Sequence, residues 1–116
     1  MVYRFMIELV QIFREYRDRW REYASIINKL SEDYFGQHFY GVYVFGSIVR
    51  GDIKPLSDID IAMVLCKGVD EFSRAKFRGL GRNRIGRVHP FQIHILTKDE
   101  WDNWYMRFVG QNYCKI

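Results

Sequence analysis

Apolar residues recur every three or four positions along the first part of the chain, with arginine, glutamate and aspartate between them. The apolar positions are Phe5, Leu9, Ile12, Phe13, Tyr16, Trp20, Tyr23, Ile27 and Leu30. This period predicts an amphipathic helical segment over residues 1–35. Because the segment is longer than an ordinary globular helix, we expect one long helix or two helices with a break near Arg17 to Arg19. An aromatic stripe at this spacing is typical of a face that packs into the core.

A different pattern follows between residues 41 and 66. The stretch YGVYVFGS alternates β-branched and aromatic residues and ends at Gly46 and Ser47, which predicts a strand. Gly51 and Pro55 then mark a turn. The stretch DIDIAMVLC is apolar at almost every position, which predicts a central strand buried on both faces. We therefore expect a strand–turn–strand unit over 41–66.

The second half of the chain predicts a basic helix and a third strand. The helix covers the stretch GVDEFSRAKFRGLGRNRIG, where Asp70 is a candidate N-cap and the helix is expected to fray at Gly79 and Gly81. The stretch HPFQIHILT alternates in the manner of a strand, so the third strand is expected over 88–97.

A last helix is predicted over 98–113. Thr97 and Glu100 have the spacing of a capping box at its start. Aromatic residues follow on one side of this helix: Trp101, Trp104, Tyr105 and Phe108. We expect Trp101 and Phe108 to pack against the sheet, and the alternative is that the aromatic segment forms an interface with a second copy or a partner protein.

The composition indicates a packed globular protein. The 116 residues are 48% hydrophobic and 17% aromatic, so we expect one domain over 1–116. The net charge of +4 is compatible with anionic ligands but is well below that of a dedicated nucleic-acid binder. Binding of RNA by the basic stretch from Arg74 to Arg87 stays open.

Other features of the sequence bear on location. No apolar run approaches the ~18 residues needed to cross a bilayer, and the first residues lack the pattern of a cleaved signal peptide, so no membrane association is expected. Cys66 and Cys114 show neither the spacing of a disulfide framework nor that of a zinc site. These features predict a cytoplasmic protein.

Two aspartates lie within the most apolar stretch of the sequence. Because side chains alternate along a strand, Asp58 and Asp60 are expected on one face, roughly 7 Å apart. Two carboxylates that repel each other and lose hydration are costly unless a cation lies between them. Mg²⁺ prefers oxygen ligands and takes one or two carboxylates together with water and phosphate oxygens. The pair therefore predicts a metal site.

The preceding strand end has the residues of a phosphate site. Gly46 would let a phosphate approach the backbone amides of the following turn, Ser47 adds a hydroxyl, and Arg50 could supply a positive charge. The alternative interpretation is structural: Gly46 closes a hairpin, Ser57 and Asp58 cap a turn, and Asp60 is an edge residue. The combination of Gly-Ser, ten intervening residues and Asp-x-Asp favours a nucleotide and metal site over that alternative.

The stretch FGSIVRGDIKPLSDIDIAMV resembles the nucleotidyltransferase superfamily that shares the DNA polymerase β palm, and the small size resembles its minimal nucleotidyltransferases. The resemblance implies an α+β fold with a small mixed sheet, core strands in the order 1-2-3, and helices on one face. It implies transfer of a nucleotidyl group, typically AMP from ATP, to a hydroxyl group. By resemblance, Asp58 and Asp60 would bind Mg²⁺ or Mn²⁺, and Gly46 and Ser47 the β- and γ-phosphates.

The sequence departs from this family at one position. Polymerases of the superfamily carry a third carboxylate on the next strand, where this chain offers Gln92 and His94. His94 is thus a candidate catalytic base or ligand, and the alternative is an ordinary half-buried histidine. Asp99 and Glu100 lie past the strand end, where they suit a helix start.

The acceptor is suggested only by the resemblance. Small members of the group often work beside a HEPN-domain toxin whose tyrosine hydroxyl they modify, so a protein acceptor of that kind is expected. The expected protein partner is such a HEPN-type protein or a second copy of this chain in a homodimer. The alternative is a weakly active or inactive nucleotide-binding module that acts through protein contacts, which the missing third carboxylate favours. A glycosyltransferase that uses Asp-x-Asp fits poorly, because such domains are longer and do not require Gly46 and Ser47.

Overall fold

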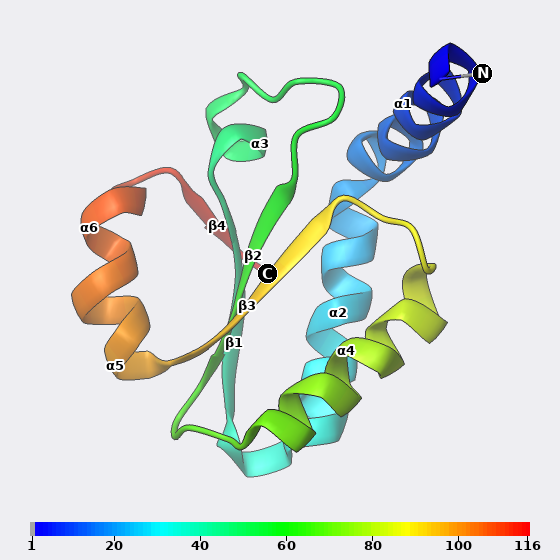
Figure 1. The fold of residues 1–116 in the computed structure, drawn as a ribbon. Coiled ribbons are helices and arrows are strands. Elements are labelled where there is room, and N and C mark those ends of the chain that lie inside the picture. Colours follow the sequence, from blue (N-terminus) through cyan, green and yellow to red (C-terminus); the bar gives the residue numbers. More distant parts are fainter. Residues whose placement is uncertain (1) are drawn as a thin grey trace.

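The amphipathic N-terminal segment forms two helices in the computed structural model, which describes residues 2–116: α1 (Val2–Asp18) and α2 (Trp20–Phe35). The helices are interrupted at Arg19, inside the predicted range. The prediction that the aromatic stripe packs into the core holds only for the later part of these two helices. The start of α1 extends away from the sheet (Figure 1), and its residues Tyr3 and Phe5 are 84% and 63% exposed. The apolar residues at the start of α1 are therefore not part of the core.

A four-stranded mixed sheet forms the centre of the structure. Its strands are β1 (Phe39–Phe45), β2 (Ile59–Leu65), β3 (Phe91–Thr97) and β4 (Tyr113–Lys115), in the order β3-β2-β1-β4. β2 and β3 are parallel, whereas β1 is antiparallel to β2 and to β4. The α+β class and the core order 1-2-3 are confirmed. β2 is central, and six of its seven residues are buried, as its apolar sequence predicts.

Helices cover both faces of the sheet, so the prediction of helices on one face is wrong. On one face, α2 and α4 (Glu71–Ile85) pack against Val42, Ile61 and Ile95. The C-terminal segment, residues 98–109, lies over the other face (Figure 1). Its residues Trp101 and Val109 pack onto a second set of sheet residues. Those residues are Tyr43, Ala62, Val64 and Leu96. The second face is apolar because β1 and β2 bury residues on both sides.

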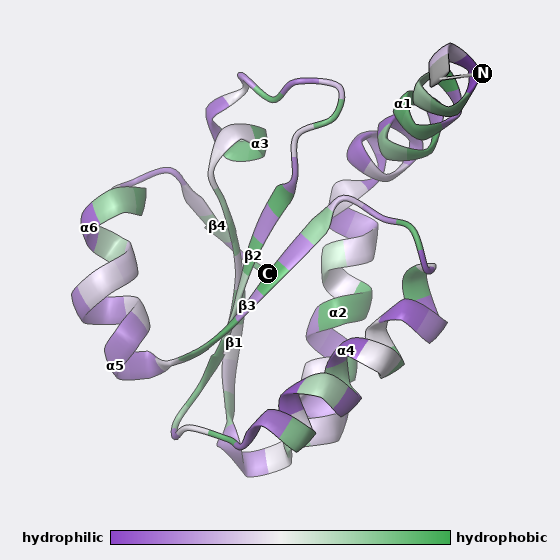
Figure 2. Ribbon diagram, viewed as in Figure 1, coloured by the Kyte–Doolittle hydropathy of each residue, from purple (hydrophilic) through white to green (hydrophobic). Residues whose placement is uncertain are grey.

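α4 continues without interruption through Gly79 and Gly81, contrary to the predicted fraying. Phe77 and Ile85 are buried on either side of these glycines, and packing of this kind outweighs a low helix propensity. The predicted cap is confirmed, since Asp70 Oδ1 accepts a hydrogen bond of 2.7 Å from the Ser73 N–H. Strongly hydrophilic residues alternate with hydrophobic ones along α4 (Figure 2).

The C-terminal segment is not a single α-helix. It consists of α5 (Lys98–Glu100), the π-helical turn η2 (Trp101–Tyr105) and α6 (Met106–Val109). The capping box of Thr97 and Glu100 is confirmed at its start. Helical structure ends before Gly110, whose φ of 60° lies in a region that favours glycine, and the chain then returns as β4. Phe108 is 82% exposed, so the prediction that it packs on the sheet is wrong.

Two short helical turns complete the structure. η1 (Gly36–His38) joins α2 to β1, and α3 (Ser47–Arg50) begins directly after Gly46. No helix within residues 2–116 is both long and apolar enough to cross a membrane.

Candidate active site

The Gly-Ser pair and the Asp-x-Asp pair meet at one end of the sheet. β1 and β2 are antiparallel and pair Phe45 with Asp60, so the end of one strand lies beside the start of the other. A β-carbon placed on Gly46 would lie 2.8 Å from Asp60 Oδ2. The two halves of the motif are therefore in direct contact, although ten residues separate Ser47 from Asp58 in the sequence.

Gly46 has a backbone conformation that only glycine adopts readily. Its φ is 83° and its ψ is −148°. This conformation turns the chain sharply out of β1 into α3, and it brings the Gly46 α-carbon against the Asp60 carboxylate. Both the backbone angles and the lack of room for a β-carbon explain the glycine at this position.

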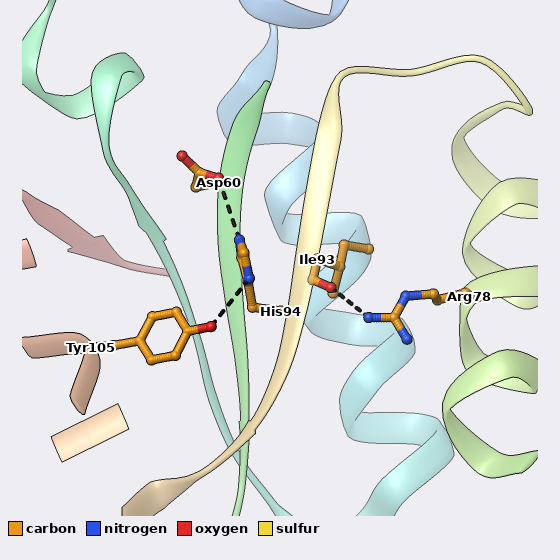
Figure 3. Close-up of polar contacts among 5 residues, drawn as sticks. All are labelled: Asp60, Arg78, Ile93, His94 and Tyr105. Carbon is orange, nitrogen blue, oxygen red and sulfur yellow. Dashed lines mark hydrogen bonds and ion pairs between the residues drawn. The ribbon is translucent and has the colours of Figure 1, made fainter. Parts of the chain in front are cut away.

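Asp60 is the first member of a polar chain that crosses three elements (Figure 3). His94 Nε2, from β3, lies 3.4 Å from Asp60 Oδ1, and His94 Nδ1 lies 3.4 Å from the Tyr105 hydroxyl of the C-terminal segment. An ionised carboxylate only accepts hydrogen bonds, so His94 Nε2 carries the proton and donates it. His94 Nδ1 then accepts from the Tyr105 O–H. In this tautomer both ring nitrogens of His94 are engaged in hydrogen bonds.

Aromatic rings surround this chain. The ring centroids of Phe45 and Tyr105 each lie 5.6 Å from that of His94. The side chains of His94 and Asp60 are 24% and 28% exposed. The imidazole of His94 is thus flanked by aromatic rings, and the Asp60 carboxylate is partly open to solvent.

Asp58 lies immediately before β2 and is exposed. Within residues 2–116, no lysine or arginine forms an ion pair with Asp58 or Asp60. Two carboxylates without a cationic side chain are a donor set that suits a hard divalent ion. No group of three histidine, cysteine, aspartate or glutamate side chains in the described residues could hold a metal ion by itself. An ion here would take its remaining ligands from water and from substrate phosphates, as Mg²⁺ commonly does.

The predicted phosphate-binding residues occupy the turn next to Asp60. Ser47 is partly buried at the first position of α3. Arg50, in the same turn, is 48% exposed, and its Nε donates to Asp52 Oδ2 over 3.4 Å. To contact a phosphate, Arg50 would have to exchange this weak ion pair.

The third strand carries no carboxylate at the site. Gln92 is the residue of β3 that pairs with Asp60, and His94 pairs with Ala62. Beside β2 at this end of the sheet, β3 thus presents Gln92 and His94 and no acidic residue.

Two residues of the site were not singled out by the sequence: Tyr105 and Phe45. Tyr105 is the last residue of the π-helical turn η2, and from there its hydroxyl reaches His94. Such turns occur frequently at functional sites. The aromatic stripe of the C-terminal segment was the only sequence signal for Tyr105. Phe45 was assigned only as a strand residue.

Comparisons with known proteins show the family to which this fold belongs. A family model described as a nucleotidyltransferase domain matches residues 24–116. The chain is 28% identical over 82 residues to the spectinomycin 9-adenylyltransferase of Staphylococcus aureus, a match that covers 66% of this chain and 32% of that protein. The chain thus spans about a third of the length of this relative. Among solved structures, it is similar to one described provisionally as a nucleotidyltransferase, with 31% identity and a TM-score of 0.61, covering 79% of this chain and 95% of that one.

Proposed function

The chain belongs to the nucleotidyltransferase domain family, and we propose that it transfers a nucleotidyl group, AMP from ATP, to a hydroxyl group of an acceptor. The observation that carries the proposal is the contact between Gly46 and the Asp60 carboxylate, at a site where no lysine or arginine of residues 2–116 forms an ion pair with Asp58 or Asp60. A carboxylate pair beside a tight glycine turn suits a triphosphate that arrives with its divalent cation.

The reaction follows from in-line displacement at phosphorus. The acceptor oxygen forms a bond to the α-phosphorus, the bond from that phosphorus to the oxygen bridging to the β-phosphate breaks, and pyrophosphate leaves with the bonding electrons. The hydroxyl proton is released to water. Mg²⁺ or Mn²⁺, when bound, would neutralise the charge of the triphosphate and lower the pKa of the attacking hydroxyl.

The residues of the chain have separate tasks in this proposal. Asp58 and Asp60 would hold the cation, while the Gly46 turn and Ser47 would contact the β- and γ-phosphates, with Arg50 adding positive charge. His94 would orient the Asp60 carboxylate, because both of its ring nitrogens are engaged in the chain from Tyr105 to Asp60. This arrangement does not favour the predicted use of His94 as a general base.

The acceptor stays a proposal of its own. The resemblance to minimal nucleotidyltransferases supports a protein hydroxyl, such as one on a HEPN-domain toxin. The adenylyltransferase relative of Staphylococcus aureus is named for spectinomycin, which makes a small hydroxyl compound the second acceptor to test.

A regulatory nucleotide-binding module is the second candidate function. The lack of a carboxylate at Gln92 or His94 favours it, because the polymerases use a third acid near the attacking hydroxyl. The retained pair of Asp58 and Asp60 beside the Gly46 turn suits such a module only if it still binds a nucleotide with its cation, and it argues against a role that uses the fold alone.

Transfer of label from ATP marked at the α-phosphate, with Mg²⁺ or Mn²⁺, tests the proposal. We expect Asp58→Asn and Asp60→Asn to abolish transfer and to leave the free energy of unfolding unchanged or higher, because each removes a repulsive charge. Asp18→Asn, at the exposed end of α1, is the matched control and should transfer normally. ATP binding without transfer to any acceptor would support the regulatory module. Transfer that survives the double substitution of Asp58 and Asp60 would overturn the metal assignment.

A further inference from the structure

β3 is an edge strand that borders a cavity next to the candidate active site. In the sheet order β3-β2-β1-β4, β3 has a single neighbouring strand. A cavity of about 570 Å³ follows its open edge and is lined by residues of β3, α4 and the C-terminal segment. His94 and Tyr105, two members of the polar chain at Asp60, belong to this lining. The cavity therefore extends from the open edge to His94 and Tyr105, next to Asp60.

The hydrogen bonds show which backbone groups of β3 face the cavity. The Ile59 N–H of β2 donates to Pro90 O over 2.8 Å. The backbone N–H and C=O groups of the even-numbered residues of β3 therefore point toward β2. Arg78 Nη2 donates to Ile93 O over 2.9 Å, and the Phe91 N–H donates to His89 Nδ1 over 3.1 Å. The odd-numbered residues thus present their backbone groups to the open edge. Two of those groups are covered by side chains, which is a common protection of exposed strands.

The two sides of this edge differ in chemistry. On the α4 side, Arg74, Arg78 and Arg82 line the cavity at intervals of one helical turn. Within residues 2–116, none of these arginines forms an ion pair. On the opposite side, His94 points away from Arg78 toward Asp60 and Tyr105 (Figure 3).

One acidic residue, Glu100, also lines the cavity, but it is already engaged. Its carboxylate accepts hydrogen bonds from the Thr97 N–H at 3.0 Å and from the Thr97 hydroxyl at 3.1 Å. The positive charge of the three arginines is therefore available to a ligand.

We propose that an extended segment of the acceptor protein adds to β3 as a further strand, with acidic side chains toward Arg74, Arg78 and Arg82 and a neighbouring hydroxyl side chain toward Asp60 and His94. This inference rests on the proposed nucleotidyl transfer for the role of the hydroxyl. Side chains alternate along a strand, so an acidic residue directly before or after the hydroxyl residue points to the opposite side of the added strand. The acidic side chain can then contact the arginines of α4 while the hydroxyl faces His94. Addition of a strand to an exposed edge is a common mode of peptide recognition.

The covered edge is consistent with such a docking step. Arg78 would exchange a neutral carbonyl, that of Ile93, for a carboxylate of the incoming segment, and charge-assisted hydrogen bonds are the stronger ones. The freed Ile93 carbonyl would accept from the N–H of the added strand. The side chain that protects the edge in the free protein thus becomes a contact for the ligand.

Binding of labelled octapeptides to the whole chain, measured without ATP by fluorescence anisotropy, tests the proposal. The probe is an alternating peptide of four Glu-Thr pairs, and its control has the same composition with four glutamates followed by four threonines. We expect the alternating peptide to bind at least about tenfold more tightly, since it alone presents one acidic and one hydroxyl row. N-methylation of every second peptide residue tests the backbone contacts, and two such patterns are possible. Methylation of the residues whose N–H groups face β3 should abolish the preference, and methylation of the other set should not.

Variants of the protein give an independent readout. The triple variant Arg74→Gln, Arg78→Gln and Arg82→Gln should lose the preference for the alternating peptide. A control with the same change of charge is Arg4→Gln, Arg14→Gln and Lys29→Gln, all exposed on α1 and α2 and distant in sequence from the cavity, and it should retain the preference. Equal binding of the two peptides would overturn strand addition. Tighter binding of a single-stranded oligonucleotide of equal charge would assign the arginines to nucleic acid instead.

The proposed function and this inference fail separately. If the alternating peptide binds but receives no label from ATP, docking on β3 stands and nucleotidyl transfer to this segment does not. If label is transferred to a protein or small acceptor while neither peptide binds, transfer stands and docking on β3 is wrong.

Discussion

The Asp60 carboxylate occupies the space beside the α-carbon of Gly46: a β-carbon on residue 46 would lie 2.8 Å from Asp60 Oδ2. Through this contact the turn after β1 determines where the carboxylate can lie. It joins a backbone feature, the positive φ of Gly46, to the one partly buried acid of the motif.

Gly46→Ala tests this relationship. The substitution combines an unfavourable φ of 83° with a clash against Asp60, whereas Gly51→Ala has a similar φ of 86° and nothing within 4 Å of its β-carbon. Each should lower the free energy of unfolding, on the order of 1–3 kcal/mol, because of the backbone strain. Gly46→Ala alone should lower label transfer on the order of a hundredfold, because it displaces the carboxylate. Chemical unfolding and label transfer measure the two effects. Equal transfer by both variants would show that the contact with Asp60 has no functional importance.

Tyr105→Phe and His94→Gln test the polar chain that ends at Asp60. If His94 orients the carboxylate, His94→Gln should lower transfer by about 10–100-fold and raise the Mn²⁺ concentration needed for half-maximal transfer, because groups behind a metal ligand act in this way. Tyr105→Phe should shift both quantities in the same direction but less. Tyr113→Phe, in β4, is the matched control and should change neither. A lower rate at an unchanged Mn²⁺ requirement, with the pH profile altered, would instead identify His94 as the base.

The features predicted correctly depend on residues close together in the sequence. The capping box needs only Thr97 and Glu100, and the N-cap needs only Asp70 and Ser73. β2 was identified as central because an apolar run buried on both faces has few other places in a sheet. The contact of Gly46 with Asp60 follows from one antiparallel pairing of neighbouring strands.

The features that were missed depend on distant parts of the chain. The sequence around Trp101 shows an aromatic stripe but not the π-helical turn that brings Tyr105 to His94. β4 has three residues and pairs with β1, about seventy positions earlier in the sequence, so no local signal marks it. The predicted fraying of α4 was wrong because burial of Phe77 and Ile85 outweighs the low helix propensity of Gly79 and Gly81.

Folding stability should depend on pH through His89. Burial, and secondly the charge of Arg82, lower the pKa of His89 below its ordinary value of 6.5. The unfolded chain therefore binds more protons than the folded one between 6.5 and the lower folded pKa, and the free energy of unfolding falls as the pH falls through that range. Protonation also removes the lone pair of His89 Nδ1 that accepts from the Phe91 N–H.

His89→Asn removes the titrating group and retains a side-chain acceptor. Urea unfolding at several pH values should show a weaker dependence of the free energy of unfolding on pH in the variant, in the range just below 6.5. His38→Asn, at the end of η1, serves as the comparison for loss of a histidine elsewhere. Identical pH dependence in His89→Asn and in the unsubstituted chain would refute the assignment to His89.

Trp101 and Trp104 lie within one turn of the C-terminal segment, but only Trp101 is packed against the sheet. Trp101 is 3% exposed and stacks on Tyr43 with ring centroids 4.8 Å apart, whereas Trp104 is 64% exposed. Trp101→Ala should lower the free energy of unfolding by about 3–5 kcal/mol, because it leaves a cavity between the segment and the sheet. Trp104→Ala should change it by less than about 0.5 kcal/mol.

The same pair of variants tests whether this packing supports the candidate site. The Trp101 ring lies 6.2 Å from that of Tyr105 and 5.8 Å from that of Phe45, so its loss should also release Tyr105 from His94. Trp101→Ala should therefore lower label transfer at temperatures where the variant is still folded, as checked by circular dichroism, and Trp104→Ala should not. A folded Trp101→Ala variant with full transfer would show that the C-terminal segment stabilises the sheet without positioning Asp60.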